Sequence, residues 1–294
     1  MLGAAWIADR AMLPAISASG NATATAIASR DASRAHKLAE QHGIPHVLPS
    51  YDALVESPDI DAVYIGLVNS LHREWATRAL AAGKHVLCEK PLAPVPDDVR
   101  AMATAAEASG RLLMEAFMYR FHPRMQAMRA AVSGVHFLHA GFAFALGRDH
   151  ANYRWHAELG GGALLDVGCY TLDVARWFLG EPERVFAGMY GEPVDTGALA
   201  ALTFPGGAVS TSWASFDGPE YQELVVVDDS GLRRVRQPFT SWRDPDDPYQ
   251  LMVEAFSASA LDGRPSPLPL SESLATAALV DRVRREAQRA SVNR

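Results

Sequence analysis

The stretch Gly83-Lys84-His85-Val86-Leu87-Cys88-Glu89-Lys90-Pro91-Leu92 decides the fold of this chain. Its apolar part, residues 85–88, predicts an interior strand of a parallel sheet. Glu89 and Lys90 would then emerge at the carboxyl end of that strand, where open α/β sheets bind their ligands. Pro91 favours an extended backbone at Lys90 and thereby keeps its ammonium at this edge. A solvent-exposed Glu-Lys pair at a strand end is the alternative interpretation.

The segments around this stretch alternate between β-type runs and amphipathic helices. Strands are expected at residues 22–28, 62–67 and 112–116, and helices at 32–42, 71–82 and 97–109. This alternation predicts an α/β fold with a doubly wound parallel sheet, of the Rossmann type, over residues 1–116.

The chain begins with an incomplete dinucleotide fingerprint. Gly3-Ala4-Ala5-Trp6-Ile7-Ala8 matches G-x-G-x-x-G at its first glycine and has alanine at the other two positions. Alanine is small enough to let a helix N-terminus approach a pyrophosphate, although an ordinary alanine-rich helix start is an equally simple interpretation. Since such a turn follows a strand of about 5 residues and Met1-Leu2 supplies only two, we expect an upstream extension or weak cofactor binding.

The residues that would meet the adenosine ribose follow the strand at 22–28. Asp31 would favour a free 2'-hydroxyl, whereas Arg30, with Arg34 one turn later, would favour a 2'-phosphate. We expect NADP, with NAD as the alternative.

After residue 116 the pattern changes to alternating strands. They are expected at residues 137–146, 184–190, 198–204, 208–216, 220–227 and 232–237, with closing helices at 249–261 and 274–290. We therefore expect a second, α+β domain over residues 117–294 with a large open, mainly antiparallel sheet. The C-terminal helices are expected to pack back on the first domain.

A second polar group lies on a helix that follows three glycines, residues 160–162. Asp166, Tyr170 and Asp173 have the spacing i, i+4 and i+7 and therefore share one helix face. The wet side of a surface helix would show the same spacing, but the flanking residues are almost all apolar and indicate burial. An ammonium beside a tyrosine lowers the pKa of the phenol from about 10, which suits proton transfer in carbonyl chemistry.

Composition narrows the class of partner. The formal net charge is -7 and no dense Lys/Arg block occurs, which argues against nucleic acid or an anionic membrane and favours a small molecule. Cys88 and Cys169 are far apart, which suits buried thiols in a reducing cytoplasm and predicts no metal site. Neither a signal peptide nor a membrane span is expected.

Taken together, several motifs resemble the glucose-fructose oxidoreductase, inositol dehydrogenase and rhizopine-catabolism family, and look closest to its dihydrodiol dehydrogenase and NADP-dependent xylose dehydrogenase branch. The motifs are Gly3-Ala4-Ala5-x-Ile7-Ala8, Asn69-Ser70-x-His72, residues 83–91, residues 115–123, Arg154-Trp155 and Gly160-Gly161-Gly162-x5-Gly168-x-Tyr170. The chain departs from the family in its short first strand, in Val68 where a proline is usual, and in the hairpin at residues 227–231.

The resemblance implies hydride transfer between NADP and a secondary alcohol or hemiacetal carbon of a sugar, cyclic diol or related small polyol. Tyr170 would take the hydroxyl proton, Lys90 would lower the pKa of Tyr170 and polarise the forming carbonyl, and Asp166 would hold the groups in register. The resemblance also implies that the second domain binds substrate and that its open sheet forms the subunit contact, so a homodimer or higher homo-oligomer is expected. A catalytically inactive cofactor sensor on the same fold is the alternative function.

The resemblance also implies contacts for the remaining site residues. Contacts with the cofactor are implied for Gly3, Ala4, Ala5, Trp6, Ile7, Ser29, Arg30, Arg34, Asn69, His72, Glu89, Lys90, Arg154 and Trp155. Contacts with the substrate are implied for Arg120, His122, Asp166 and Tyr170, and Arg154 and Trp155 are also candidates for the pocket wall. A purely structural histidine before Pro123 is an alternative for His122.

Overall fold

The computed structural model describes residues 1–147, 149, 151–240 and 245–292, with backbone only for residues 289–292. The chain divides into two compact units, each built from separate segments. The first comprises Met1–Ala93, Asp97–His122 and Ser241–Leu274, and the second Pro94–Pro96, Pro123–Thr240 and Ala275–Arg294.

The first unit contains parallel strands in two small sheets. β4 (His85–Cys88) lies between β3 (Ala62–Ile65) and β5 (Leu113–Glu115), and β1 (Ala26–Ile27) pairs with β2 (His46–Val47). Leu2 connects them, because it forms parallel bridges with both Ala28 and Ile65. Of the two residues before Gly3, Leu2 thus pairs with strands on both sides and lies between the two small sheets.

Helices of the first unit begin and end at recognisable caps. Asp31 caps α2 (Ala32–His42), Ser50 caps α3 (Tyr51–Glu56) and Asp247 caps α8 (Pro248–Asp262), each with its side chain accepting a backbone N–H. α8 packs against α1 (Leu13–Ala18) and against the short helix η3 (Met118–Phe121). The other helices of this unit are η1 (Ala8–Met12), η2 (Asn69–Leu71), α4 (His72–Ala81) and α5 (Pro96–Ser109).

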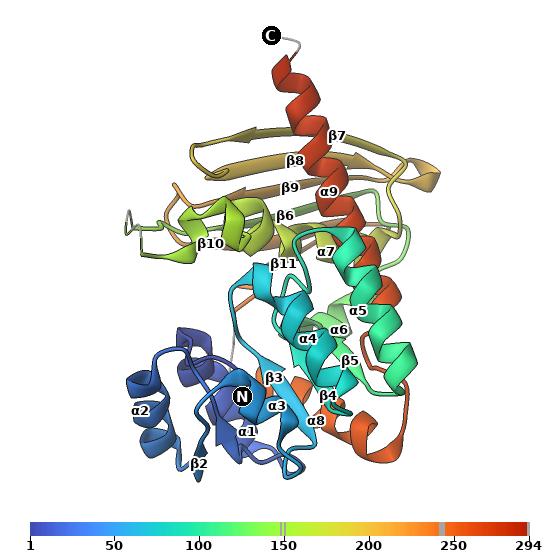
Figure 1. Cartoon of the computed structure of the whole chain (residues 1–294). Helices are drawn as coiled ribbons and strands as arrows, with labels where there is room; N and C mark the ends of the chain where they lie inside the picture. The colour runs from blue at the N-terminus through green and yellow to red at the C-terminus, as the bar shows by residue number, and fades with distance from the viewer. Residues whose placement is uncertain (148, 150, 241–244, 293–294) are drawn as a thin grey trace. The chain divides into compact units, whose positions relative to one another are not determined.

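The second unit is built on a six-stranded sheet with the strand order β11-β10-β6-β9-β8-β7 (Figure 1). The strands are β6 (Phe137–Ala143), β7 (Arg184–Tyr190), β8 (Gly197–Thr203), β9 (Val209–Ser215), β10 (Tyr221–Asp228) and β11 (Gly231–Arg236). Only β6 and β9 pair in parallel among these neighbours, so the sheet is mainly antiparallel, as expected.

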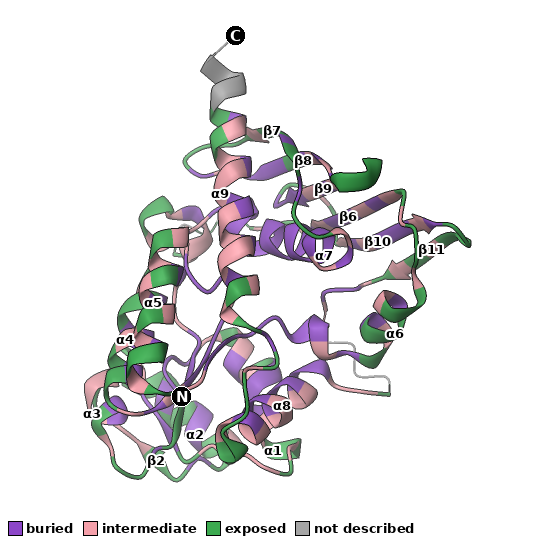
Figure 2. Ribbon diagram, turned by 90° about the vertical axis from the view of Figure 1, so that its right-hand side faces the viewer, coloured by how far each residue is buried: buried purple, intermediate pink, exposed green. Residues whose placement is uncertain are grey.

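One face of this sheet is covered by a helix that is buried along almost all of its length (Figure 2). It starts as the π-helix η6 (Leu164–Gly168), continues as α7 (Cys169–Leu179), and packs on β6 and β9. The remaining helices are α6 (Pro123–Ala131), η4 (Tyr153–Trp155), η5 (Ala157–Leu159), η7 (Pro205–Gly207) and α9 (Leu270–Val292). No helix in the described part of the chain is long and apolar enough to cross a membrane.

Candidate active site

Glu89 and Lys90 directly follow the central strand of the β3-β4-β5 sheet. The Glu89 side chain is only 8% exposed and its Oε1 accepts a hydrogen bond of 2.8 Å from the hydroxyl of Tyr64, while Oε2 accepts one of 3.2 Å from the Lys90 backbone. Burial and the negative charge of Glu89 raise the pKa of Tyr64, which keeps this phenol a neutral donor. Glu89 is therefore buried and not solvent-exposed, contrary to the alternative interpretation, and it fixes the backbone at Lys90.

The turn after Lys90 is held by two further side chains. The Glu115 Oε1 accepts a 2.7 Å hydrogen bond from the Leu92 N–H. His72 is fully buried, with Nδ1 2.9 Å from the Pro91 carbonyl oxygen and Nε2 3.1 Å from that of Leu67. Asn69, in the same loop after β3, is also buried, at 2% exposed.

The turn at residues 3–8, where the dinucleotide fingerprint was expected, is tightly packed. Gly3 adopts a φ of +94°, and a Cβ at this position would lie 2.7 Å from the Gly66 carbonyl oxygen, so no larger residue fits. Ala4 and Ala5 follow with small side chains and Ile7 is half-buried, whereas Trp6 is 70% exposed. The Arg34 Nη2 donates a 2.8 Å hydrogen bond to the Ala4 carbonyl and ties the turn to α2.

Arg30 and Asp31, which are expected near the adenosine ribose of the cofactor, have different surroundings. The Asp31 carboxylate caps α2 by accepting hydrogen bonds from the Ser33 hydroxyl (2.6 Å) and the Arg34 N–H (3.2 Å), and these bonds lower the pKa of Asp31. Ser29 accepts a 3.2 Å hydrogen bond from the Asp31 N–H. Arg30 is exposed, and its guanidinium has no hydrogen-bond or ion-pair partner among the residues that the structure describes.

In the second unit, the polar residues of the glycine-led helix are buried. Asp166, Tyr170 and Asp173 are 3%, 5% and 1% exposed, so the interpretation as a wet helix face is wrong. Asp173 has a separate task, because its Oδ1 accepts a 2.9 Å hydrogen bond from Thr276 of α9. The Tyr170 ring packs against Phe142 and Phe239, with centroids 5.6 and 5.4 Å away.

Arg154 pairs with Asp166 inside the second unit. Its Nε lies 2.6 Å from the Asp166 Oδ2, and its guanidinium carbon lies 5.0 Å from the centroid of the Tyr153 ring. Burial alone would lower the pKa of Arg154, but the charge of Asp166, helped by Tyr153 and Tyr170, raises it above its usual value. Sequence reasoning proposed Arg154 for the cofactor or the pocket wall but had no signal for this ion pair, whose partners lie on different elements.

The glycines before the helix allow two close approaches. A Cβ on Gly161 would lie 2.5 Å from the Arg154 carbonyl oxygen, and one on Gly162 would lie 2.2 Å from the Asp195 Oδ1. The other carboxylate oxygen of Asp195 accepts a 2.7 Å hydrogen bond from the Leu164 N–H, where the π-helix begins. Asp195, which the sequence did not single out, therefore fixes the start of the helix that carries Asp166 and Tyr170.

The other candidates are buried polar groups with internal contacts. Arg120 is 7% exposed and forms an ion pair with Glu272 in the first unit, at 3.4 Å. His122 is 3% exposed at the N-terminal end of α6. The indole N–H of Trp155 donates to the Gly147 carbonyl at 3.0 Å.

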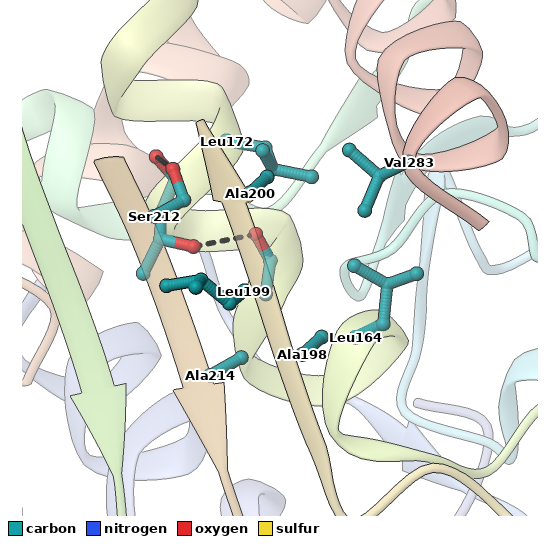
Figure 3. Close-up of a pocket in the computed structure, with 10 residues that line it drawn as sticks. Leu164, Leu172, Ala198, Leu199, Ala200, Ser212, Ala214 and Val283 are labelled. Atoms are coloured by element: carbon teal, nitrogen blue, oxygen red, sulfur yellow. Dashed lines mark hydrogen bonds between the residues drawn. The ribbon is translucent and has the colours of Figure 1, made fainter. Parts of the chain in front are cut away.

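The structure thus groups the candidates by unit. Lys90, Glu89, His72, Arg120 and His122 belong to the first unit. Arg154, Asp166 and Tyr170 belong to the second, together with a cavity of about 10 Å³ between η6, α7, β8, β9 and α9 (Figure 3). That cavity is lined by apolar side chains such as Leu164, Leu172 and Val283 and has room for about one water molecule, so it is not a substrate site. Within the described residues, no cluster of His, Cys, Asp and Glu could hold a metal ion.

Two family models and several known proteins match this chain. A family model described as "Oxidoreductase family, NAD-binding Rossmann fold" matches residues 1–117, and the GFO/IDH/MocA C-terminal domain model matches residues 130–232. The chain is 35% identical to D-xylose 1-dehydrogenase (NADP(+)) 2 of Haloferax volcanii, over 98% of this chain and 96% of that protein. It is 40% identical to trans-1,2-dihydrobenzene-1,2-diol dehydrogenase of Xenopus tropicalis, over 55% of this chain and 51% of that protein.

A solved structure covers nearly the whole chain. It is a tyrosine-to-phenylalanine mutant of KijD10, a 3-ketoreductase from Actinomadura kijaniata, in complex with TDP-benzene and NADP. The two chains are 31% identical with a TM-score of 0.90, over 97% of this chain and 96% of KijD10.

Proposed function

Because this chain belongs to the Gfo/Idh/MocA family of oxidoreductases with an NAD(P)-binding Rossmann domain, we propose that it transfers a hydride between NADP and a small polyhydroxylated substrate. The reacting carbon is a secondary alcohol or hemiacetal carbon of a sugar, cyclic diol or related polyol. The observation that carries the proposal is the buried tyrosine, Tyr170, on the same continuous helix as Asp166, whose carboxylate pairs with Arg154. The named relatives, which act on D-xylose and on a cyclic diol, support the substrate class.

Tyr170 is the proposed acid-base group. In the oxidation direction its phenolate takes the proton from the substrate hydroxyl, and in reduction its hydroxyl returns it. NADP supplies the hydride acceptor and NADPH the hydride donor. Lys90 favours the phenolate by its positive charge and donates a hydrogen bond to the forming carbonyl oxygen.

Asp166 and Arg154 are proposed to orient the reacting groups. The Asp166 side chain is 5% exposed and the Arg154 side chain is 31% exposed, so the pair holds the buried carboxylate in one geometry, and removing the guanidinium would leave this carboxylate without its ion-pair partner. In this arrangement one Asp166 oxygen is fixed by the Arg154 Nε. Arg154 also interacts electrostatically with Tyr170, which favours the phenolate from within the second unit.

The first unit has residues that fit NADP. The glycine conformation at Gly3 and the small side chains of Ala4 and Ala5 leave room for a pyrophosphate at the start of the helix that follows. Arg30 is exposed and available for a 2'-phosphate, whereas the Asp31 carboxylate is occupied by capping α2. These two observations support a preference for NADP over NAD.

Turnover measurements with Tyr170→Phe test the proposed function. The variant keeps the ring and its packing against Phe142 and Phe239 but removes the proton acceptor, so turnover should fall by about 10²- to 10⁴-fold. Cofactor affinity and melting temperature should stay close to wild type. Tyr51→Phe, which removes a hydroxyl from an α3 residue, is the control and should retain full turnover.

The substrate panel should contain pentoses, hexoses and dihydrodiols, and Lys90→Met should be assayed on whichever substrate is turned over. Substantial turnover by Tyr170→Phe would contradict the proposed role of Tyr170. Tight NADPH binding without turnover of any panel member would instead favour the cofactor-sensing alternative.

We also propose that the protein forms a homo-oligomer through the face of its six-stranded sheet that α7 does not cover. The neighbouring strands β7, β8 and β9 expose large apolar side chains on this face, at Phe186 (58%), Tyr190 (55%), Leu199 (54%) and Val209 (40%). An exposed apolar patch of this kind is typical of an interaction surface, and a second copy of the same face is its proposed partner.

A further inference from the structure

His72 has two ring nitrogens, and each lies within hydrogen-bond distance of a backbone carbonyl oxygen. Nδ1 is 2.9 Å from the Pro91 oxygen and Nε2 is 3.1 Å from the Leu67 oxygen. A carbonyl oxygen only accepts hydrogen bonds, so each contact requires an N–H on the ring. A neutral imidazole has one N–H, and it can therefore satisfy only one of the two carbonyls at a time.

The surroundings of His72 favour the neutral ring. The side chain is fully buried, and this burial lowers the pKa of His72, with a further lowering from the charge of Lys90. The carbonyls of Pro91, Leu67 and Leu92 act in the opposite direction without reversing the shift. Of the two contacts, the one to Pro91 is shorter and more deeply buried, which favours the tautomer with its single N–H at Nδ1.

Two backbone groups next to the Lys90 side chain are held by hydrogen bonds: the Lys90 N–H and the Pro91 carbonyl. On one side the Lys90 N–H donates to Glu89, and on the other His72 holds the carbonyl of the next residue. His72 is the first residue of α4, which packs on β3 and β4, and this packing gives the ring a rigid base. The ring itself is buried and points at backbone, not at solvent.

We propose that His72 is a positioning residue, whose Nδ1–H holds the Pro91 carbonyl and thereby fixes the backbone from which the Lys90 side chain projects. The catalytic part of this proposal rests on the proposed function of Lys90. His72 acts through Lys90 and makes no contact with substrate, and its Nε2 contact with Leu67 is dispensable.

Two amide substitutions separate the contacts. In His72→Asn the carboxamide nitrogen lies near the place of Nδ1 and can still donate to Pro91, whereas in His72→Gln it lies near the place of Nε2 and reaches Leu67. We expect His72→Asn to retain turnover within a few-fold and His72→Gln to lose about ten- to hundredfold, since a buried carbonyl then lacks its donor. His72→Leu should resemble His72→Gln. If it does not fold, the Asn-Gln comparison decides alone.

A direct measurement on Lys90 makes the test independent of turnover. The rate at which Lys90 is labelled by an amine-reactive reagent, followed by mass spectrometry over a pH series, gives the reactivity profile of its amino group. His72→Gln should shift this profile and His72→Asn should leave it unchanged. His85→Gln is the matched control. The His85 ring also forms a hydrogen bond with a backbone group, the Leu112 N–H, but His85 is the first residue of β4 and therefore lies at the end of the strand opposite to Lys90. His85→Gln should leave the profile unchanged.

The outcomes separate this proposal from the proposed function. Equal Lys90 profiles in the Asn and Gln variants, or equal losses of turnover in both, would overturn the positioning role of His72. His72 would then contribute only to the packing of the buried core. If the profile shifts as expected but Lys90→Met keeps full turnover, His72 still positions Lys90 and the proposed catalytic role of Lys90 is wrong. If Lys90→Met abolishes turnover while the Lys90 profiles of the two His72 variants stay equal, Lys90 keeps its proposed catalytic role and the positioning role of His72 is wrong.

Discussion

At the scale of single residues, Arg30 and Asp31 show how neighbouring charges acquire different tasks. Both are exposed, but the Asp31 carboxylate accepts hydrogen bonds from Ser33 and from the Arg34 backbone at the start of α2. The sequence alone leaves open which of the two charges reads the ribose. Because the Asp31 carboxylate caps α2, Arg30 is the residue whose side chain remains available to contact the ribose.

Arg30→Ala is therefore expected to weaken NADP selectively. A charge-assisted contact with a phosphate contributes roughly 1.5–3 kcal/mol, so the Michaelis constant for NADP should rise about ten- to hundredfold. The constant for NAD, which lacks the 2'-phosphate, should change little. Steady-state kinetics with both cofactors check this, and Lys37→Ala on the exposed side of the same helix serves as control. Parallel changes for NADP and NAD would contradict the role of Arg30 and make Asp31 the residue to test.

Other single residues acquire their roles only in the folded chain. The position of Lys90 beyond the end of β4 was predictable, because a continuous apolar run that ends in charge marks the end of a buried parallel strand, whereas its role stays a prediction. The Arg154–Asp166 pair was not predictable, since nothing in the spacing of two residues on separate elements reports a contact of 2.6 Å. Asp195 is a similar case, because its partner Leu164 lies 31 residues earlier in the chain.

At the scale of secondary-structure elements, periodicity predicted the long elements well and the short ones poorly. Helix 32–42 and strand 184–190 agree with α2 and β7 at both ends. The expected strand at 22–28 pairs only over residues 26–28, as β1 and the bridge of Ala28 to Leu2, and β2 was missed, because two paired residues are too few to show alternation. The π-helix before α7 was also missed, since a change from i→i+4 to i→i+5 bonding has no sequence signature.

The start of that π-helix is expected to depend on pH through Asp195. Burial raises the pKa of Asp195 to about 6, compared with about 3.9 for an unfolded chain. Between these values the folded chain binds more protons at this carboxyl than the unfolded chain does. The contribution of Asp195 to the free energy of unfolding is therefore fully present below about pH 3.9 and is lost as the pH rises through about 6.

Asp195→Asn removes this titration and keeps an oxygen that can accept the Leu164 N–H. The stability of the variant relative to wild type should therefore improve between about pH 4 and about pH 7. Thermal or urea unfolding over that range measures the difference. Asp262→Asn, at an exposed carboxylate on α8, is the control for a general charge effect. A difference between Asp195→Asn and wild type that stays constant with pH would show that Asp195 does not titrate as expected.

At the scale of the whole molecule, the chain builds its compact units from separate segments. Residues 241–274 belong with the Rossmann strands, and residues 94–96 belong with the six-stranded sheet. Periodicity identifies an element but not the unit in which it packs, so the place of residues 94–96 in the second unit could not be taken from the sequence. The expectation that C-terminal helices pack back on the first domain stays a prediction. The boundary expected between residues 116 and 117 stays a prediction.

The exposed face of the six-stranded sheet leads to a prediction about assembly. Phe186 and Leu199 lie on adjacent strands, and Leu199 is directly opposite Trp213 of β9, so the apolar side chains form one continuous surface. A stable dimer covers about 800 Å² on each partner, and placing a charge within such a surface leaves it desolvated without a partner. We expect the wild-type protein to have a mass of at least two chains of 31.8 kDa in light scattering after size exclusion. Leu199→Glu should reduce it to that of one chain.

The matched control for this prediction is Leu261→Glu. Leu261 is 74% exposed, which exceeds the 54% of Leu199, but it lies on α8 in the other unit and far along the chain from the sheet. The substitution adds the same charge to a leucine that is at least as accessible but does not lie on the sheet face, so it should leave the oligomeric mass unchanged. Circular dichroism should show that both variants keep their secondary structure, so that loss of mass cannot be assigned to unfolding. A folded Leu199→Glu variant with the wild-type oligomeric mass, or a wild-type protein that is monomeric at micromolar concentration, would contradict the sheet face as the subunit contact.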